Sequence, residues 1–584
     1  MRNNIDVEKL KKARSFIDYY PEYEILEDLH LENDAYVVKV RITLSNIKNS
    51  YIPNQTDWYI VFESDQQIDF YPAKTNSINV TFPHQALNTI IEGYNYRKGK
   101  PCLDVPGHTL NLPNEYYPYA QGNKIHWYLG RMIEWLKNAA ENTLLKNGDP
   151  FEVPTNEYSG TDLLYKENKI EDWSIFNYSY GYVKLNQVKL DKNYFVLDEL
   201  YDMNLTEARG TIFWGDFKNK FSNNIYESLW IRCPSFPIKY PWEYPNTWEE
   251  LFSIFREKKL DIFKIIFELL RKNNSYKKRS NYLLLACPIP EKVGESEKSY
   301  YWLMCDIPEI IYPRNGFRKG AAGFKSCVKI ALKGKINWHG THNWDDSVIR
   351  TRGQMRRELG DLTYTIIGAG SLGSHVSEHL VRQGAKHLKI IDGDLINIGN
   401  LARHVLCVDD LNRAKTKSLA KMLVNISPSV QIATIDNYLD NTNVSKLENT
   451  DVIIDCSGNN EVLEILSNYQ FSDKKEIYVG AFNYGATRFG YYKIKTERFN
   501  CDIYNSKTLE FYNAETIDES NLIMEGIGCY HPIFPATYSD VSIWASIFVK
   551  EIISTLNKDV KEKLKFFELE DGAVKILKDE EVQI

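Results

Sequence analysis

The sequence contains no long apolar segment. No hydrophobic run among its 584 residues approaches the roughly 18 residues that a membrane-spanning helix requires. Residues 1–6 are polar and carry no apolar stretch of the kind found in a signal peptide, so none is evident. These absences predict a protein that makes no contact with a membrane and resides in the cytoplasm.

Paired cysteines and an excess of basic charge are also missing. The nine cysteines form no CxxC pair, which argues against a zinc ribbon and favours reduced thiols. The 71 Lys and Arg residues face 78 Asp and Glu residues, so the net charge is -7 and a globally basic nucleic-acid-binding protein is excluded. We interpret the one basic run, 271–279, as a solvated loop and expect no direct contact with nucleic acid.

The length of the chain points to several domains. At about 150 residues per domain, 584 residues correspond to three or four domains. The hydrophobic share of 43% and the charged share of 26% are ordinary for a globular protein. We place three domains in the chain, over residues 1–160, 161–340 and 341–584.

The first domain is typical of an α+β fold. β-branched and aromatic residues alternate with polar ones in three segments, a pattern that favours an antiparallel meander. A charged helix should precede the strands, and a long helix with one apolar stripe should follow them. The expected helices cover residues 7–19 and 125–145, and the expected strands cover 36–42, 58–62 and 78–82.

The middle region is predicted to be an α/β linker domain, and the sequence does not indicate its role. Thr247 and Glu250 form a capping box that should open an apolar helix extending to Leu270. Residues 282–287 are typical of a strand.

The last domain shows the alternation of a Rossmann-like, doubly wound parallel sheet. A buried strand, 363–367, leads into the glycine-rich segment 368–373 and then a helix. A second apolar strand ends in Asp392, and residues 451–455 form a further strand of the same kind.

The glycine-rich segment predicts a nucleotide site. Gly368, Gly370 and Gly373 form a GxGxxG pattern in the required context, after a strand and at the start of a helix. Glycines permit a tight turn and close backbone approach, and the helix N-terminus favours phosphate. Asp392 lies 24 residues after Gly368, where it can bind ribose hydroxyls. These features alone also permit an NAD enzyme.

Three further residues favour ATP. Asn400, Arg403 and Lys415 follow the acidic strand end, and a dehydrogenase has no need for such a cluster. An enzyme in which a carboxylate attacks the α-phosphate of ATP does need it, because charge grows on the phosphates as pyrophosphate leaves. The ordered blocks GxGxLG, DxDxxxxxNLxR and a downstream Lys resemble the ThiF/E1 adenylating family over about residues 345–550.

This resemblance implies roles for individual residues. Asp392 would bind ribose, and Asn400, Arg403 and Lys415 would bind the phosphates of ATP. Lys417 remains an alternative to Lys415, because the spacing from Arg403 is one residue short.

The resemblance also implies a homodimer and Mg²⁺. Arg352 stands where the family places an arginine that reaches into the other half of a dimeric site. Two positions depart from the family pattern: His404 replaces its usual glutamine, and Gly458 replaces the acid that usually partners Mg²⁺. Asp455, at the end of its strand, is the remaining candidate metal ligand.

One cysteine near the C-terminus is a candidate nucleophile. Cys529 lies in the glycine-flanked segment 525–532, where His531 would lower the pKa of its thiol. A thiolate converts an acyl-adenylate to a thioester. Cys501 is the rival for this role, whereas Cys407 and Cys456 are interpreted as structural.

A second candidate cysteine lies in the first domain. The segment 99–103, with Cys102 at its fourth position, resembles the G-K-I-C-L block of ubiquitin-conjugating (E2, or UBC-like) enzymes. The His-Pro-Asn motif that precedes this block in the family is missing, and Asn95 is displaced by one residue from the position of its asparagine. The side chain that would stabilise an oxyanion near Cys102 is therefore left open.

Together the two resemblances indicate the E1–E2 fusion proteins of bacterial CBASS anti-phage operons. That family implies activation of the C-terminal tail of a carrier protein, a cGAS-like nucleotidyltransferase, and its conjugation to an acceptor lysine. The acyl group would be relayed from Cys529 to Cys102. Three alternatives stay open: a ThiF-like sulfur-carrier adenylyltransferase, an NAD-binding Rossmann oxidoreductase, and a non-catalytic scaffold.

Overall fold

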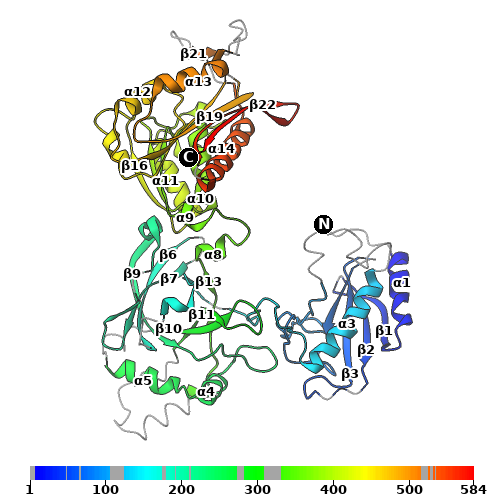
Figure 1. Ribbon diagram of the computed structural model, residues 1–584. Coiled ribbons are helices and arrows are strands. Elements are labelled where there is room, and N and C mark those ends of the chain that lie inside the picture. Colours follow the sequence, from blue (N-terminus) through cyan, green and yellow to red (C-terminus); the bar gives the residue numbers. More distant parts are fainter. Residues whose placement is uncertain are drawn as a thin grey trace. The chain divides into compact units, whose positions relative to one another are not determined.

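The computed structural model describes most of the chain from residue 7 to residue 583. The residues that it does not describe, besides both ends, are 34, 46, 48, 65–66, 105–123, 159, 174–178, 191–192, 210–211, 273–281, 308–330, 484, 514–523, 526–530, 533–534 and 559. The chain forms two compact units, which Figure 1 displays together. One unit holds Met1–Ile212 and Ser222–Asn343, and the other holds Phe213–Phe221 and Trp344–Ile584.

The N-terminal part of the first unit is a four-stranded antiparallel meander with its strands in sequence order. Helix α3 lies across one face of this sheet (Figure 1), and Leu129 and Leu136 of α3 pack with Val38 and Trp58 in a fully buried core. The elements are α1 (Val7–Ser15), β1 (Tyr23–Glu32), β2 (Ala35–Thr43), β3 (Gln55–Phe62), β4 (Ile68–Pro72) and α3 (Lys124–Glu141).

The predicted meander and both helices are confirmed, but one strand was wrong. Residues 78–82 are not a strand, although Ile78 and Phe82 are buried. The side-chain amide of Asn88 donates to the backbone carbonyls of Ile78 and Val80. A side chain therefore makes the hydrogen bonds that a neighbouring strand would make. Strand β1 was missed because its acidic residues hide the alternation of apolar ones. Helix α3 also ends earlier than expected, before Asn142, whose φ is 58°.

The rest of the first unit is built on a nine-stranded sheet of order β12-β11-β10-β9-β6-β7-β5-β13, with β8 paired to β7. Helices α4 and α5 pack on its core. The strands are β5 (Asp162–Tyr165), β6 (Tyr180–Lys189), β7 (Asn193–Asp202), β8 (Glu207–Arg209), β9 (Phe221–Arg232), β10 (Tyr282–Pro290), β11 (Glu297–Asp306), β12 (Trp338–His339) and β13 (Thr341–Asn343).

The predicted capping box is present, but the predicted helix is broken. Thr247 accepts from the amide of Glu250 at 3.3 Å, and Glu250 accepts from the amide of Thr247 at 3.2 Å. The apolar segment then forms two helices, α4 (Trp248–Glu257) and α5 (Ile262–Lys272). They are separated at Lys259, whose φ of 64° no helix accommodates.

The second unit contains an eight-stranded sheet of order β16-β15-β14-β17-β18-β19-β22-β23. Its first five strands are parallel, as predicted for a doubly wound domain, and the last three are antiparallel additions. The strands are β14 (Thr363–Ile367), β15 (His387–Ile391), β16 (Gln431–Ile435), β17 (Val452–Asp455), β18 (Lys475–Phe482), β19 (Arg488–Thr496), β22 (Val560–Glu570) and β23 (Ala573–Gln583).

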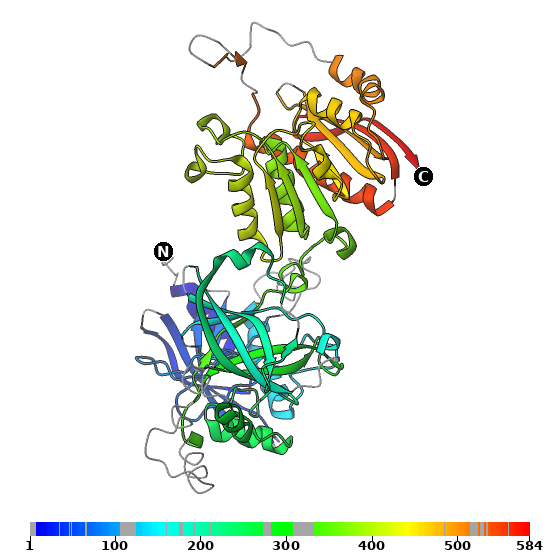
Figure 2. The same cartoon turned by 90° about the vertical axis from the view of Figure 1, so that its left-hand side faces the viewer.

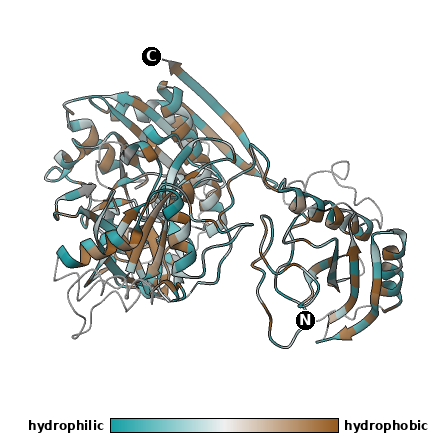
Figure 3. Ribbon diagram, turned by 90° about the horizontal axis from the view of Figure 1, so that it is seen from below, coloured by the Kyte–Doolittle hydropathy of each residue, from teal (hydrophilic) through white to brown (hydrophobic). Residues whose placement is uncertain are grey.

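Helices cover both faces of this sheet (Figures 1 and 2). Successive residues of β19 point to opposite faces, so Tyr491 contacts Phe548 of α14 while Tyr492 contacts Tyr504 of α13. The strand at one edge of the sheet, β23, carries both hydrophilic and hydrophobic residues (Figure 3). The helices are α8 (Asp346–Ile349), α9 (Arg357–Gly360), α10 (Ser371–Gln383), α11 (Lys415–Ile426), α12 (Asn460–Asn468), α13 (Cys501–Asn513) and α14 (Tyr538–Lys558). Among the described helices of the whole chain, none is both long and apolar enough to cross a bilayer.

A short segment from the middle of the chain, Phe213–Phe221, belongs to the second unit. The amide of Asp216 donates to the carbonyl of Val430 at 2.9 Å, and its carboxylate accepts from the amide of Ile432 at 2.7 Å. Phe217 is buried beside Trp344. The segment therefore binds the end of α11 and the edge strand β16.

Replacing Gly215 with alanine should detach this segment. Gly215 has a φ of 50°, and an added Cβ would lie 2.4 Å from the carbonyl oxygen of Val430. We expect a loss of about 2–4 kcal/mol in the unfolding free energy, from backbone strain and overpacking together. Urea unfolding measures it against Gly485→Ala, which has a φ of 89° but open space at its Cβ and should cost only about 1 kcal/mol. Equal losses in both variants would contradict the close contact.

Candidate active site

The glycine-rich loop joins β14 to α10 and needs its glycines for shape. Gly368 has a φ of 86°, and a Cβ at Gly373 would lie 1.9 Å from the carbonyl oxygen of Gly368. Gly370 caps the start of α10, and no atom lies within 4 Å of where its Cβ would be. This leaves the backbone amides at the N-terminus of a thirteen-residue helix accessible to a phosphate.

Asp392 ties this loop to the end of the neighbouring strand. One carboxylate oxygen accepts from the amide of Ala369 at 2.6 Å, and the other accepts from the amide of Asp394 at 2.7 Å. The side chain follows β15 directly and is buried. Each oxygen keeps a further lone pair, so the carboxylate can still accept a hydroxyl hydrogen.

The structure separates the two candidate lysines. The Nζ of Lys415, at the start of α11, lies 2.7 Å from the Oδ2 of Asp394, whereas Lys417 is exposed and pairs with Asp436. Burial opposes ionisation of Asp394, but hydrogen bonds from Lys415 and Tyr438 outweigh it and lower the pKa of the carboxyl group. Lys415 is therefore the ammonium group that lies beside the acidic end of β15.

Arg403 lies at the N-terminus of α10. Its Nε donates to the Oγ of Ser371, the first residue of that helix, at 3.0 Å. The side-chain oxygen of Asn400 instead accepts from the amide of Asn397 and so closes its own turn. The predicted residues thus meet at one end of the parallel sheet: the glycine loop, Asp392, Arg403 and Lys415, with Asn400 in the turn that leads to Arg403.

His404 is buried and its ring is hydrogen-bonded to the glycine loop, a contact that the sequence alone did not indicate. Its Nδ1 accepts from the amide of Leu406 at 3.2 Å, so its Nε2 carries the hydrogen and donates to the carbonyl of Ala369 at 2.7 Å. Burial lowers the pKa of His404 to about 4, so the ring is neutral at physiological pH.

Replacing His404 with glutamine should reduce the sensitivity of the protein to acid. Because the folded pKa is depressed, His404 contributes stability that is present above about pH 6.5 and lost as the pH falls toward about 4. A shift of this size corresponds to roughly 3 kcal/mol. Urea unfolding at pH 7 and pH 4.5 should therefore show a smaller difference in unfolding free energy for His404→Gln than for the wild type. An unchanged difference would contradict this prediction.

Asp455 meets only part of what a magnesium site requires. It ends β17 opposite Ile367, next to the glycine loop, and burial raises its pKa to about 6 against hydrogen bonds from Ser457. Among the described residues, no three His, Cys, Asp or Glu side chains form a metal cluster. Mg²⁺ bound to nucleotides uses one or two carboxylates plus phosphates and water, so a single buried carboxylate here fits that pattern. Gly458, with a φ of 63°, faces open space.

Cys102 is exposed, and a backbone hydrogen bond fixes the position of its main chain. Its amide donates to the carbonyl of His84 at 2.7 Å, and the side chain of Gln85 donates to the carbonyl of Gly99 at 2.8 Å. His84 Nδ1 lies 3.0 Å from a carboxylate oxygen of Glu152, and this hydrogen bond raises the pKa of the imidazole. His84 was not among the residues expected near Cys102, although it lies upstream of the cysteine in the segment Phe82-Pro83-His84.

Cys529 lies outside the described residues, but the segments around it are described. The strands β20 (Met524–Glu525) and β21 (His531–Pro532) pair in antiparallel fashion on either side of it in the sequence. The chain then enters α14 at Tyr538, whose ring centroid lies 4.5 Å from that of His375 on α10. Helix α14, which follows this segment in the sequence, therefore begins against the helix of the glycine loop.

The other cysteines and the predicted dimer residue differ in exposure. Burial raises the pKa of the thiols of Cys501 and Cys456, which makes both poorer nucleophiles. Cys407, interpreted from the sequence as structural, is exposed and lies outside the strands. Arg352 is also exposed, and none of the described carboxylates forms an ion pair with it.

Two regions of the chain match known protein families. Residues 142–344 match the Cap2 central linker domain, and residues 346–581 match the ThiF family. The ATP-dependent ubiquitin transferase-like protein Cap2 of Enterobacter hormaechei is 27% identical over 565 residues, which cover 92% of each chain. The molybdopterin-synthase adenylyltransferase of Haemophilus influenzae is 34% identical over 99 residues, covering 17% of this chain and 41% of that protein.

Solved structures were matched at lower similarity. A crystal structure of E. coli MccB with succinimide has 16% identity and a TM-score of 0.29, covering 39% of this chain and 64% of that one. A structure of E. coli MccB with AMPCPP and MccA has 14% identity and the same TM-score, covering 47% and 80% of the two chains.

Proposed function

Because this chain is a homologue of the Cap2 proteins and carries an E1-like adenylation domain of the ThiF family, we propose that it activates the C-terminal carboxylate of a carrier protein with ATP. The observation that supports this most is the meeting of Arg403, Lys415 and the N-terminus of α10 at one end of the parallel sheet. All three carry positive charge or partial charge suited to a triphosphate.

The first step is adenylation. An oxygen of the carrier carboxylate attacks the α-phosphorus, the bond between that phosphorus and the bridging oxygen breaks, and pyrophosphate leaves. The Arg403 guanidinium and the Lys415 ammonium stabilise the charge that grows on the phosphates. Asp392 would bind the ribose, and Asn400 would support the phosphate contacts from its turn. Asp455 would hold Mg²⁺, which neutralises phosphate charge when bound.

The following steps move the acyl group between thiols. The Cys529 thiolate attacks the acyl carbon, AMP leaves, and a thioester forms. The Cys102 thiolate then displaces Cys529, and finally the amine of an acceptor lysine attacks to give an amide and a free thiol. The group stays activated at each stage because a thioester remains a good acyl donor. The exposure of Cys102 supports its part in this relay.

The carrier in this proposal is a cGAS-like nucleotidyltransferase of a CBASS anti-phage operon. The likeness to a Cap2 protein along 92% of the chain supports this reading. The short match to a molybdopterin-synthase adenylyltransferase favours a second candidate, a sulfur-carrier adenylyltransferase. Pyrophosphate release from ATP tests both, because it should require the carrier with a free C-terminal carboxylate and fail when that terminus is amidated. The two candidates differ in a later step, because only a conjugating enzyme needs Cys102 to transfer the carrier to an acceptor amine.

The active form should be a homodimer formed through the ThiF domain. Arg352 is exposed and unpaired among the described residues, and in the family such an arginine completes the partner's site. A two-fold dimer is also the commonest assembly of soluble proteins. Light scattering at micromolar concentration should give twice the 68.0 kDa of one chain. A fully active protein with the mass of a monomer would contradict the prediction.

A further inference from the structure

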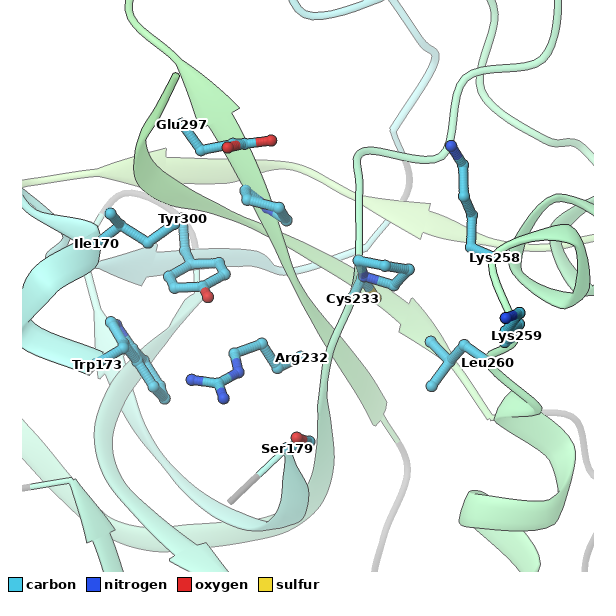
Figure 4. Close-up of a pocket in the computed structure, with 12 residues that line it drawn as sticks. Ile170, Trp173, Ser179, Arg232, Cys233, Lys258, Lys259, Leu260, Glu297 and Tyr300 are labelled. Atoms are coloured by element: carbon cyan, nitrogen blue, oxygen red, sulfur yellow. The ribbon is translucent and has the colours of Figure 1, made fainter. Parts of the chain in front are cut away.

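The linker domain contains a cavity of about 740 Å³, but its described lining residues form no shared charged site. Figure 4 shows the Arg232 side chain pointing toward Tyr300. Lys258 and Lys259 lie on the other side of the cavity. Trp173 is 1% exposed, so it offers no ring face to a ligand. A closer group of polar contacts lies in the second unit, where β15 and β16 end.

Tyr438 lies just beyond the end of β16, beside Gly393. The side chain of Asn443 is buried and donates to the carbonyl of Tyr438 at 2.8 Å, which fixes the main chain of the tyrosine. The amide of Asp392 donates to the carbonyl of Ile435 at 3.2 Å, so the ends of β15 and β16 are joined. Tyr438 therefore lies at the same end of the parallel sheet as the glycine loop.

The missing side chain of Gly393 makes room for the Tyr438 ring. A Cβ at Gly393 would lie 2.9, 2.9 and 3.0 Å from three neighbouring carbons of that ring. These nearly equal distances mean that the ring packs its face against Gly393. Tyr438 is 60% exposed, so the ring can move outward without disturbing the core. The change Gly393→Ala should therefore displace the ring.

The Tyr438 hydroxyl begins a series of hydrogen bonds that ends at Lys415. It donates to the Oδ1 of Asp394. The Oδ2 of Asp394 accepts from the Lys415 ammonium at 2.7 Å, and the Lys415 amide donates to the carbonyl of Asp394 at 3.0 Å. The amide of Asp394 in turn donates to the carboxylate of Asp392 at 2.7 Å. Asp394 thus connects the residue proposed for ribose with the lysine proposed for phosphate.

Both oxygens of Asp394 need a partner if its carboxylate is to keep one orientation. The terminal torsion of an aspartate is broad, so a carboxylate that is bound through one oxygen only can rotate. An ammonium group has three hydrogens, so Lys415 can bind Asp394 with one and phosphate oxygens with the others. The direction of those other hydrogens depends on the position of the carboxylate.

We propose that Tyr438 is a positioning residue for adenylation. Its hydroxyl fixes the Asp394 carboxylate, and this carboxylate orients the Lys415 ammonium toward the triphosphate. The inference rests on the function proposed above, because it concerns the same nucleotide site.

Tyr438→Phe in the full chain should lower kcat/KM for ATP in carrier-dependent pyrophosphate exchange by about tenfold, the scale of one hydrogen bond to a charged group. Gly393→Ala keeps every polar group and should cause a similar loss. In an Asp394→Asn chain, Tyr438→Phe should cost little more, because residues of one hydrogen-bond network are not additive. Full additivity would overturn the proposal, since it would mean that Tyr438 acts independently of Asp394.

The matched control is Tyr469→Phe. The hydroxyl of Tyr469 also donates to a carboxylate, that of Glu448, at 3.0 Å. This variant loses a similar hydrogen bond in the same unit and should keep full exchange. An equal loss in Tyr469→Phe and Tyr438→Phe would overturn the proposal.

A second measurement requires neither carrier nor ATP. The full chain is treated with limiting acetic anhydride, and peptide mass spectrometry compares labelling of Lys415 with that of the exposed Lys417. The Lys415 side chain is 8% exposed beside Asp394, so its relative labelling should rise severalfold in Tyr438→Phe and stay unchanged in Tyr469→Phe. An unchanged ratio in Tyr438→Phe would overturn the proposal. A raised ratio, in a protein whose wild type shows no exchange, would support the contact and overturn the proposed function alone.

Discussion

Cys529→Ala is expected to abolish every thioester that the chain forms while leaving adenylation intact. The alanine variant has no nucleophile to displace AMP, but the glycine loop, Arg403 and Lys415 lie on other elements and are unaffected. The variant should therefore still exchange pyrophosphate into ATP when the carrier is present, and should show no reducible adduct on a non-reducing gel. Full conjugation by Cys529→Ala would remove this residue from the relay.

Two further variants place Cys102 after Cys529. Cys102→Ala should accumulate a reducible adduct on Cys529 and fail to pass it on. Cys102→Lys should trap the acyl group as an amide that survives reduction, because an amide is a poor acyl donor. Cys501→Ala is the matched control and should conjugate normally, since the thiol of Cys501 has a raised pKa. Unchanged conjugation in Cys102→Ala would make the N-terminal domain a binding module.

Arg403→Ala is expected to reduce ATP–pyrophosphate exchange by about 10²-fold or more, the scale of losing one preorganised charge partner in the transition state. The guanidinium contacts Ser371 at the start of α10 and is half-buried, so its loss should leave the fold intact. The matched control is Arg382→Ala, which removes an exposed arginine from the last turn of the same helix and should keep full exchange. Equal activity of the two variants would contradict the role of Arg403.

The parts of the site that depend on local sequence were predictable. A strand, three spaced glycines and a helix define the loop without tertiary information, because a Cβ at Gly373 would collide with the carbonyl of Gly368. The ends of neighbouring parallel strands meet at one edge, so Asp392 was correctly expected beside that loop.

The parts that depend on packing were not predictable. The spacing from Arg403 is one residue short of the family pattern, so the sequence left both Lys415 and Lys417 as candidate phosphate ligands. The contact of Lys415 with Asp394 is what distinguishes the two lysines in the structure. His404 departs from the family pattern, yet it packs under the glycine loop, a contact made by residues 35 positions apart. The segment Phe213–Phe221 joins the second unit through long-range backbone bonds that leave no periodic signal.

The central claim is that the glycine loop serves ATP rather than NAD. Calorimetric titration of the intact chain with ATP and Mg²⁺, and in parallel with NAD, tests it directly. If Arg403 and Lys415 bind the triphosphate as proposed, ATP should bind, Arg403→Ala should weaken this binding, and NAD should give no heat of binding. Binding of NAD without binding of ATP would contradict it.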